Sequence, residues 1–159
     1  MNFWLKATNL HIEQAKISHA YDCAMLHKSA FYRGWTIQEF EIFLSDPKNS
    51  PIFISLNKRG KMAGFAIIKK AGSEAELLSI VVNKKWRSKG VGRTLLKALI
   101  DDLFNSSVEE LFLEVDENNK SAIHLYKNFG FLEVGKREGY YRLKNGKKTS
   151  ALVMALKLD

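Results

Sequence analysis

The sequence predicts a single α/β domain of the α+β kind, in which strands and helices alternate along much of the chain. The length of 159 residues fits one domain that spans residues 1–159. Apolar residues run or alternate over strand-length segments at 52–56, 62–68 and 77–82, whereas they recur at helical spacing over 94–104. No repeat, low-complexity tract or linker divides the chain, so we expect no second domain.

Two helices are predicted near the start of the chain. Residues 12–31 form the first of them, and the side chains that recur there at helical spacing are Ile17, Tyr21, Ala24, Met25 and Lys28. Thr36 and Glu39 form a capping box that opens a second, shorter helix. Asp46 and Pro47 end this second helix.

A hairpin and a third strand are predicted next. Strands at 52–56 and 62–68 flank a turn at 57–60, and the strand after Gly72 ends at Val82. The remaining elements are expected in the order helix, strand, helix, strand and strand. The later helix carries one apolar stripe that Gly130 ends, formed by Ala122, Ile123, Leu125, Tyr126 and Phe129.

A basic loop with two glycines lies between the strand that ends at Val82 and the helix that follows. Its residues are Arg87, Ser88, Lys89, Gly90, Val91, Gly92 and Arg93. The glycines let successive backbone N–H groups face one hollow, to which the positive end of the next helix adds its dipole. Lys84 and Lys85 add two more cations, so the loop favours a pyrophosphate or another narrow polyanion. The spacing fits neither a Walker loop nor a dinucleotide-binding fingerprint.

The pattern Arg87-x-x-Gly90-x-Gly92 resembles the acetyl-coenzyme A loop of the GCN5-related N-acetyltransferases, the GNAT superfamily. The segment 114–131 resembles the second signature of the same superfamily, in the right order and separated from the loop by one helix and one strand. The segment 135–141 and the strand at 152–156 resemble the ending of the bacterial ribosomal-protein alanine N-acetyltransferases, the RimI type. The resemblance runs from about residue 15 to the C-terminus.

The resemblance implies the GNAT fold, with a mixed, mostly antiparallel central sheet whose two central strands splay apart, flanked by helices. It also implies that acetyl-coenzyme A (acetyl-CoA) is the acetyl donor. The loop at 87–93 would hold the pyrophosphate, and Asn119 would reach the cofactor from the far side. The strand edge formed by Ile80, Val81 and Val82 would pair with the pantetheine arm and offer N–H groups to the oxyanion.

Glu114 and Tyr126 are the catalytic residues that the resemblance implies. Glu114 would accept the proton of the amine, directly or through water, and Tyr126 would protonate the departing thiolate. From the residues alone, the alternative roles are an ion pair or strand cap for Glu114 and core packing for Tyr126. We expect direct transfer, because Cys23 lies in a helix without a basic motif and no histidine has metal-ligand spacing.

The acceptor side is implied to consist of aromatic residues that clasp a short N-terminal peptide, namely Phe31, Tyr32, Trp35, Tyr140 and Tyr141. The resemblance implies the terminal alanine of ribosomal small-subunit protein eighteen as the acceptor. Gly34 departs from the group, which often has proline before the tryptophan. One alternative is an acetyltransferase for another protein N-terminus or a small-molecule amine. The other is a non-catalytic protein that binds RNA or the ribosome.

The net charge of +8 at neutral pH is concentrated in two clusters. One is the loop at 84–93, and the other consists of Lys136, Arg137, Arg142, Lys144, Lys147 and Lys148. The second cluster either faces an acidic acceptor or ribosomal RNA, or is a solvated loop. The single cysteine and the lack of a signal or membrane-spanning segment predict a cytoplasmic protein. We expect a monomer, without DNA or membrane partners.

Overall fold

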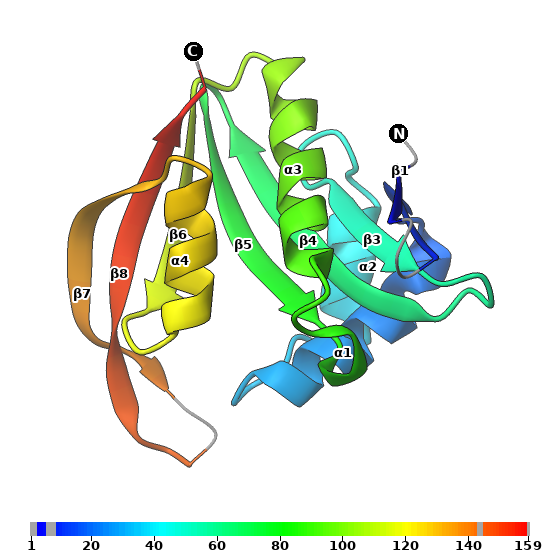
Figure 1. Ribbon diagram of the computed structural model, residues 1–159, viewed down its shortest axis with the longest axis horizontal. Coiled ribbons are helices and arrows are strands. Elements are labelled where there is room, and N and C mark those ends of the chain that lie inside the picture. Colours follow the sequence, from blue (N-terminus) through cyan, green and yellow to red (C-terminus); the bar gives the residue numbers. More distant parts are fainter. Residues whose placement is uncertain (1–2, 6–8, 143–144, 159) are drawn as a thin grey trace.

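The computed structural model describes residues 3–5, 9–142 and 145–158, and it shows one twisted sheet between two layers of helices (Figure 1). The strands are β1 (Phe3–Leu5), β2 (Leu10–Gln14), β3 (Ile52–Leu56), β4 (Met62–Ala71), β5 (Glu74–Val82), β6 (Glu110–Asp116), β7 (Leu132–Arg142) and β8 (Lys148–Lys157). The helices are α1 (Ala20–Ala30), α2 (Ile37–Leu44), α3 (Val91–Phe104) and α4 (Lys120–Asn128), with short 3-10 turns at Ile17–His19 and Lys84–Trp86.

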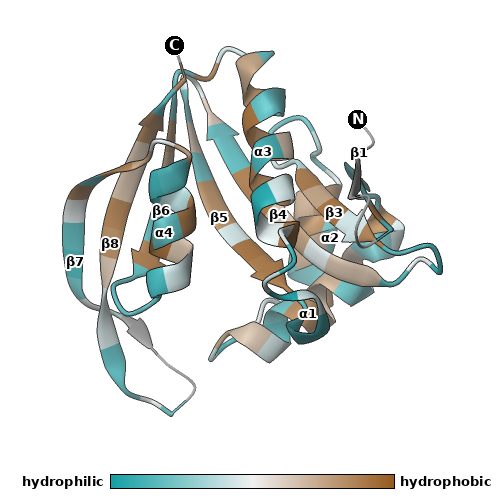
Figure 2. Cartoon of the chain, viewed as in Figure 1, coloured by the Kyte–Doolittle hydropathy of each residue, from teal (hydrophilic) through white to brown (hydrophobic). Residues whose placement is uncertain are grey.

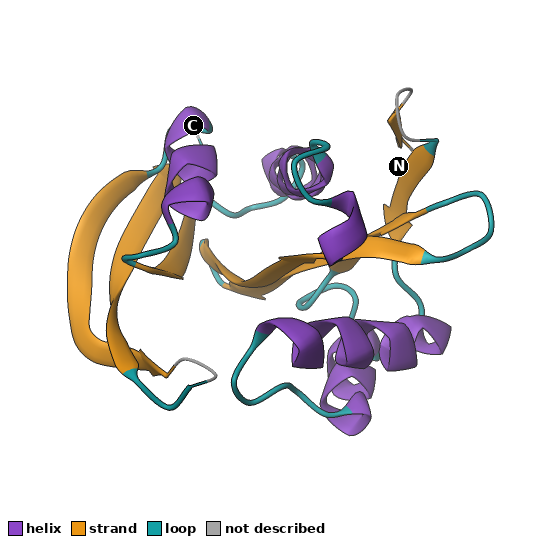
Figure 3. Cartoon of the chain, turned by 60° about the horizontal axis from the view of Figure 1, so that its bottom comes forward, coloured by secondary structure: helices purple, strands orange, loops and turns teal. Residues whose placement is uncertain are grey.

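The strands lie in the order β1-β2-β3-β4-β5-β6-β8-β7, and every neighbouring pair is antiparallel except β5 and β6. The predicted mixed, mostly antiparallel sheet is therefore confirmed. Helices α3 and α4 lie on one face of the sheet, and α1 and α2 lie on the other (Figure 3). Hydrophobic residues line the central strands between these layers (Figure 2).

Each face of the sheet has its own hydrophobic core. The core under α3 and α4 is built around fully buried leucines of α3, Leu95, Leu96 and Leu99. The core under α1 and α2 is built around Phe40 and Phe65, which are also fully buried. Burial of such side chains contributes about 1.5 to 3 kcal/mol each, so both helical layers are held by packing against the sheet.

The central strands β5 and β6 splay apart, as the sequence resemblance implies. Their parallel pairing runs from Glu74 opposite Glu110 to Leu77 opposite Leu113 and ends there. Both strands continue beyond that point, and Figure 1 shows them diverging. A bulge lies at the same place, because β4 pairs Ile67 with Ser79 but Ile68 with Leu77. The bulged residue increases the local twist, so the divergence starts where the register shifts.

The prediction of a helix over residues 12–31 is wrong at its start. Residues 10–14 form strand β2, in which Leu10 and Ile12 are buried and alternate with His11 and Glu13. This strand pairs with β1 and β3, and such long-range pairing overrides the local helical spacing.

The expected apolar face of the first helix is also wrong, except at Ala24, which is buried. Ile17, Tyr21 and Met25 are exposed by 54%, 59% and 41% of their surface. The buried residues of α1 are instead Ala20, Cys23, Ala24, Leu26 and His27. These five residues form the buried face of α1.

Other local predictions are confirmed. The Thr36 side chain accepts a hydrogen bond from the Glu39 N–H and caps α2, which ends at Leu44 before Asp46. Gly130 has a φ of +98°, the left-handed conformation expected of a glycine just after a helix. The turn after β3 is held by the Asn57 side chain, which accepts from the N–H groups of Arg59 and Lys61.

Candidate active site

A groove of about 770 Å³ runs between the basic loop and α4. Ile80, Val81 and Val82 of β5 form one wall of this groove, and α4 forms the other. Apart from Lys89, every residue expected to bind the cofactor lines it, and Trp86 and Leu125 line it as well. The walls of the groove come from four segments, because Ala30 and Phe31 at the end of α1 line it as well as β5, the basic loop and α4.

The loop geometry fits a phosphate chain. Ser88 and Gly90 have φ values of +61° and +81°, so the backbone curls just before α3 begins. The first N–H groups of α3 have no carbonyl partner inside the helix, and Gly90 supplies no side-chain cap. Exposed N–H groups at a helix N-terminus attract anions. The loop therefore presents both donors and the positive end of a helix dipole to the groove.

Aromatic rings and the backbone position the cations of this loop. The Lys89 ammonium lies 5.5 Å from the centroid of the Trp86 ring, and the Arg93 guanidinium carbon lies 5.6 Å from that of Phe129. The Arg87 Nε donates to the Val82 carbonyl at 3.4 Å. These three side chains stay exposed to solvent, so their charges remain available to an anionic ligand.

A second hollow of about 330 Å³ opens where β5 and β6 diverge. Residues 77–80 of β5 and 113–116 of β6 line two of its sides. Phe31 and Tyr32, at the end of α1, form a third side. We call this hollow the acceptor pocket, because Phe31 and Tyr32 are among the residues that the sequence resemblance implies for the acceptor side.

Tyr126 lines both the acceptor pocket and the groove, and so do Phe31, Ile80 and Asn119. The Tyr126 side chain is 5% exposed, and its ring centroid lies 5.7 Å from that of Phe131 in the core. Tyr126 therefore packs in the core and also lines both hollows. A rigidly packed ring holds its hydroxyl in a fixed place.

Glu114 reaches the acceptor pocket because of the alternation along β6. Leu111, Leu113 and Val115 are buried in the core under α3 and α4. Glu114 consequently lies on the opposite face, where its carboxylate forms an ion pair with Arg137 of β7 at 2.7 Å. The Glu114 side chain is 19% exposed and that of Arg137 is 51% exposed. The alternative role of Glu114 in an ion pair is thus observed together with its place in the pocket.

Arg137 is itself held by an aromatic ring. Its guanidinium carbon lies 3.7 Å from the centroid of the Tyr140 ring. The pKa of Arg137 is raised, first by the hydrogen bond to Glu114. Sequence reasoning placed Arg137 in a general basic cluster and missed this contact, because Arg137 and Glu114 are 23 positions apart.

A neighbouring hollow of about 400 Å³ shares Leu113 and Glu114 with the acceptor pocket. Glu74, Glu76 and Lys69 contribute its charged side chains. Burial raises the pKa of the Glu76 carboxyl, and the negative charge of Glu114 raises it further. The open face of the sheet beside Glu114 is therefore rich in carboxyl groups.

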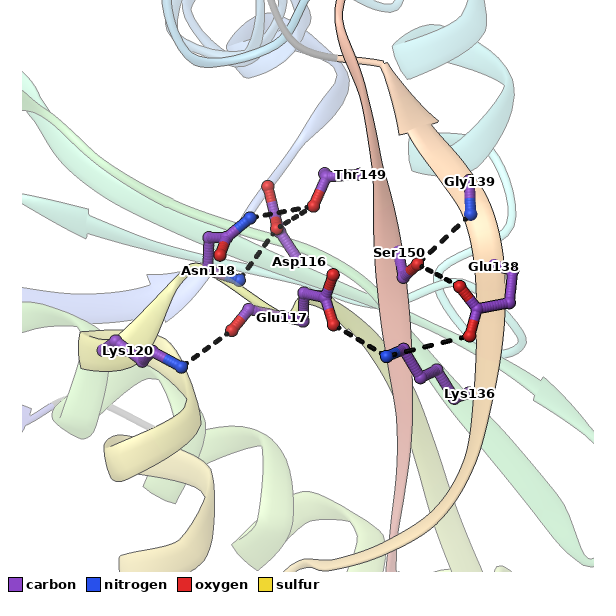
Figure 4. Close-up of polar contacts among 9 residues, drawn as sticks. All are labelled: Asp116, Glu117, Asn118, Lys120, Lys136, Glu138, Gly139, Thr149 and Ser150. Carbon is purple, nitrogen blue, oxygen red and sulfur yellow. Dashed lines mark hydrogen bonds and ion pairs between the residues drawn. The ribbon is translucent and has the colours of Figure 1, made fainter.

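A polar network fixes the turn between β6 and α4 to the last hairpin (Figure 4). Asp116 accepts from the Asn118 N–H and from the Thr149 hydroxyl, and the Asn118 amide donates to Thr149 at 2.9 Å. The next residue, Asn119, caps α4 by accepting from the Ala122 N–H. This network sets the position of Asn119 at the boundary of both hollows.

The same network pairs basic residues of the second cluster with carboxylates of the chain. The Lys136 ammonium lies 3.0 Å from Glu117 and 3.7 Å from Glu138, and Glu138 also accepts from the Ser150 hydroxyl. With the ion pair of Arg137, two of the cluster's cations are thus engaged within the chain. Lys144 and the side chain of Arg142 lie outside the described residues.

A buried histidine organises the connection between α1 and α2. His27 is 3% exposed, and its ring stacks against Phe31 at 4.3 Å and against Trp35 at 4.4 Å between centroids. Its Nδ1 accepts a hydrogen bond from the Trp35 N–H. Burial lowers the pKa of His27 to about 4. We call this connection the α1–α2 loop (31–36). The neutral His27 ring holds it through the two stacking contacts and the hydrogen bond.

Gly34 in this loop packs directly on α1. A Cβ at this position would lie 2.7 Å from the Lys28 Cα, which is closer than real contacts of this kind. A side chain at this position would therefore require the backbone to shift.

The expected acceptor residues are only partly brought together. Phe31 lines the acceptor pocket, whereas Trp35 lines a separate hollow between α1 and α2. The Tyr140 ring packs against Arg137, and Arg137 is paired with Glu114. The side chain of Tyr141 lies outside the described residues.

Other reactive groups of the chain lie away from the site. Cys23 is fully buried, and burial raises the pKa of its thiol to about 12, which makes it a poor nucleophile. Within the part of the chain that the structure describes, no group of three or more His, Cys, Asp and Glu residues is arranged to hold a metal ion. Among the described residues, none of the helices has the length and apolar character needed to span a membrane.

The sequence is similar to those of known acetyltransferases. The sequence model of the acetyltransferase (GNAT) family matches residues 20–131. The ribosomal protein bS18-alanine N-acetyltransferase of Escherichia coli K12 is 39% identical over 117 residues, which are 74% of this chain and 78% of that protein. The N-alpha-acetyltransferase RimI of Mycobacterium tuberculosis is 32% identical over 130 residues, which are 78% of this chain and 79% of that protein.

A solved structure has a similar fold. The crystal structure of the ribosomal-protein-S18-alanine N-acetyltransferase from Escherichia coli matches with a TM-score of 0.84 and 31% identity, covering 94% of each chain. The chain therefore belongs to the acetyltransferase (GNAT) family and is an N-acetyltransferase.

Proposed function

We propose that this protein transfers the acetyl group of acetyl-CoA to the α-amine of an N-terminal alanine, that of ribosomal protein bS18. The observation that carries the proposal is the position of Tyr126, which lines both the groove and the acceptor pocket that contains Glu114. The names of the relatives in Escherichia coli and Mycobacterium tuberculosis support the acceptor class.

The lining of the groove supports acetyl-CoA as the donor. The loop at 87–93 offers N–H groups, a helix N-terminus and the exposed cations Arg87 and Arg93 to a pyrophosphate in the groove. Beyond Leu77, β5 has no strand neighbour on the β6 side among the residues that the structure describes. This free edge can pair with the amide groups of the pantetheine arm, as an added strand would. Acetyl-CoA bound there supplies an acetyl group activated as a thioester.

Glu114 is proposed to take the proton of the acceptor amine. An α-amine has an ordinary pKa of about 8, compared with about 10.4 for a lysine side chain, so it needs less help to lose its proton at neutral pH. The ion pair between Glu114 and Arg137 is partly exposed, and such pairs contribute little. An arriving ammonium group can therefore replace the guanidinium at the carboxylate.

Tyr126 is proposed to give its hydroxyl proton to the departing sulfur atom. Its ring is held by Phe131 and the surrounding core, and the residue lines both hollows. A phenol remains protonated at neutral pH and is a suitable donor to a developing thiolate. We propose direct transfer, because burial raises the pKa of the Cys23 thiol and makes it a poor nucleophile.

The test is an acetylation assay read by mass spectrometry. The purified protein is incubated with acetyl-CoA and a peptide that copies the alanine-starting N-terminus of bS18. A matched peptide carries the same sequence with its terminus blocked. We expect one acetyl group on the free peptide and none on the blocked one. Equal acetylation of both peptides would mean that lysine side chains are the acceptors, and no acetylation of either would refute the proposed acceptor.

A further inference from the structure

Ser79 is a polar residue within the apolar run 77–82 of β5, and the bulge determines which way it faces. Regular alternation would place Ser79 on the same face as Leu77, in the core under α3 and α4. The register shift at Leu78 instead places it on the face of Val81, which packs in the core under α1 and α2. Glu114 lies on this face as well, across the gap between the splayed strands.

The Ser79 hydroxyl lacks a hydrogen-bond partner among the described residues. Ser79 is 6% exposed, and its Oγ is buried. Other polar groups of the acceptor pocket are engaged: Glu114 with Arg137, and Asp116 with Asn118. A buried hydroxyl without a partner destabilises a fold. Because Ser79 lies in the wall of the acceptor pocket, a ligand bound there can supply the partner that the protein does not.

The two hollows distinguish the possible ligands. Ser79 lines the acceptor pocket but is absent from the walls of the groove, although its neighbours Ile80 and Val81 line that groove. A hydroxyl on the acceptor side meets the acceptor amine rather than the pyrophosphate or the pantetheine arm.

We infer that Ser79 is an acceptor-binding residue, whose Oγ accepts a hydrogen bond from an N–H of the incoming primary amine. This inference rests on the proposed function and adds a second contact for the amine beside Glu114. Two contacts fix the direction of the nitrogen lone pair, whereas one leaves the amine free to rotate. Ser79 thus contributes to acceptor affinity and alignment.

The chain offers a matched control at Ser55 of β3. Ser55 is fully buried and its Oγ also lacks a partner among the described residues, but it does not line the acceptor pocket or the groove. Ser79→Ala and Ser55→Ala therefore remove the same kind of group. Only the first of them touches the proposed site, so a comparison separates acceptor binding from a general effect on the fold.

The experiment measures kcat/KM for the acceptor peptide, the dissociation constant of acetyl-CoA and the melting temperature. We expect Ser79→Ala to lower kcat/KM for the peptide about tenfold, the effect of one hydrogen bond to a substrate. Its acetyl-CoA affinity should stay within about twofold, and its melting temperature should not fall. Ser79→Thr, which keeps the hydroxyl, should recover most of the activity, and Ser55→Ala should keep all of it.

Two results would overturn the inference. One is an unchanged kcat/KM in Ser79→Ala, and the other is a loss of activity accompanied by a lower melting temperature or weaker acetyl-CoA binding. The wild-type rate separates these results from failure of the proposed function. If wild type acetylates none of a panel of primary amines, the proposed function fails and the role of Ser79 fails with it. If wild type is active and the variant is equally active, only the role of Ser79 is refuted.

Discussion

Acidification should destabilise this protein through His27, a residue of α1 whose ring packs against Phe31 and Trp35 of the α1–α2 loop. Burial lowers the pKa of His27 from 6.5 to about 4. Between these two values the unfolded chain binds a proton that the folded chain does not, so stability is present above pH 6.5 and is lost as the pH falls toward 4. One pKa unit corresponds to about 1.36 kcal/mol, so the loss amounts to about 3 kcal/mol.

The surroundings of His27 support this sign. Phe31, Trp35, Phe40 and Phe65 surround the ring with apolar surface. The Trp35 N–H donates to Nδ1, which must therefore be unprotonated. A proton on this nitrogen would break the hydrogen bond and leave a charge in an aromatic pocket. The α1–α2 loop, which carries Phe31 into the acceptor pocket, should loosen as a result.

The assay is urea unfolding of wild type and His27→Gln at a series of pH values from 7.5 to about 4. Glutamine can still accept from the Trp35 N–H but has no proton to gain, so its profile should lack the contribution of His27. Because carboxylates also titrate near pH 4, the difference between the two profiles is the quantity of interest. His124→Gln, at an exposed histidine of α4, should follow wild type. Parallel profiles for wild type and His27→Gln would refute the reasoning.

Three further predictions concern the site and its walls. Glu114→Gln should lower kcat/KM for the acceptor by about 100-fold, most strongly at acid pH, where the amine is chiefly protonated; a flat and undiminished pH–rate profile would exclude Glu114 as the base. Tyr126→Phe should lower kcat by about 100-fold with little change in melting temperature, and full activity of this variant would leave Tyr126 with a packing role alone. Gly34→Ala should destabilise the fold by about 1 to 3 kcal/mol, because its Cβ would meet the Lys28 backbone at 2.7 Å; calorimetry checks this, and an unchanged melting temperature would contradict it.

Features that depend on neighbouring residues were predictable from the sequence. The Thr36 cap of α2, the left-handed Gly130 after α4 and the Asn57 turn follow from local backbone chemistry. The loop at 87–93 belongs to this class, since its glycines and cations act together within a few residues. The resemblance then implied what local chemistry does not, namely the divergence of β5 and β6, which the structure shows, and the catalytic roles that we propose for Glu114 and Tyr126.

Features that depend on distant residues were missed. Strand β2 forms because β1 and β3 pair with it, although its residues fit a helical pattern as well. The contact of Arg137 with Glu114 needs β7 to lie beside β8 and β8 beside β6. The orientation of Ser79 depends on a bulge against β4. The only sequence signal for Ser79 was its polarity within an apolar strand.

Donor and acceptor are proposed to bind together, in two hollows that both include Tyr126. Initial rates measured while both acetyl-CoA and the alanine-starting peptide are varied test whether both substrates bind before transfer. Double-reciprocal plots at a series of peptide concentrations should intersect, because the amine attacks only when both substrates are present. Parallel lines would instead indicate an acetylated form of the enzyme, and they would contradict direct transfer at this junction.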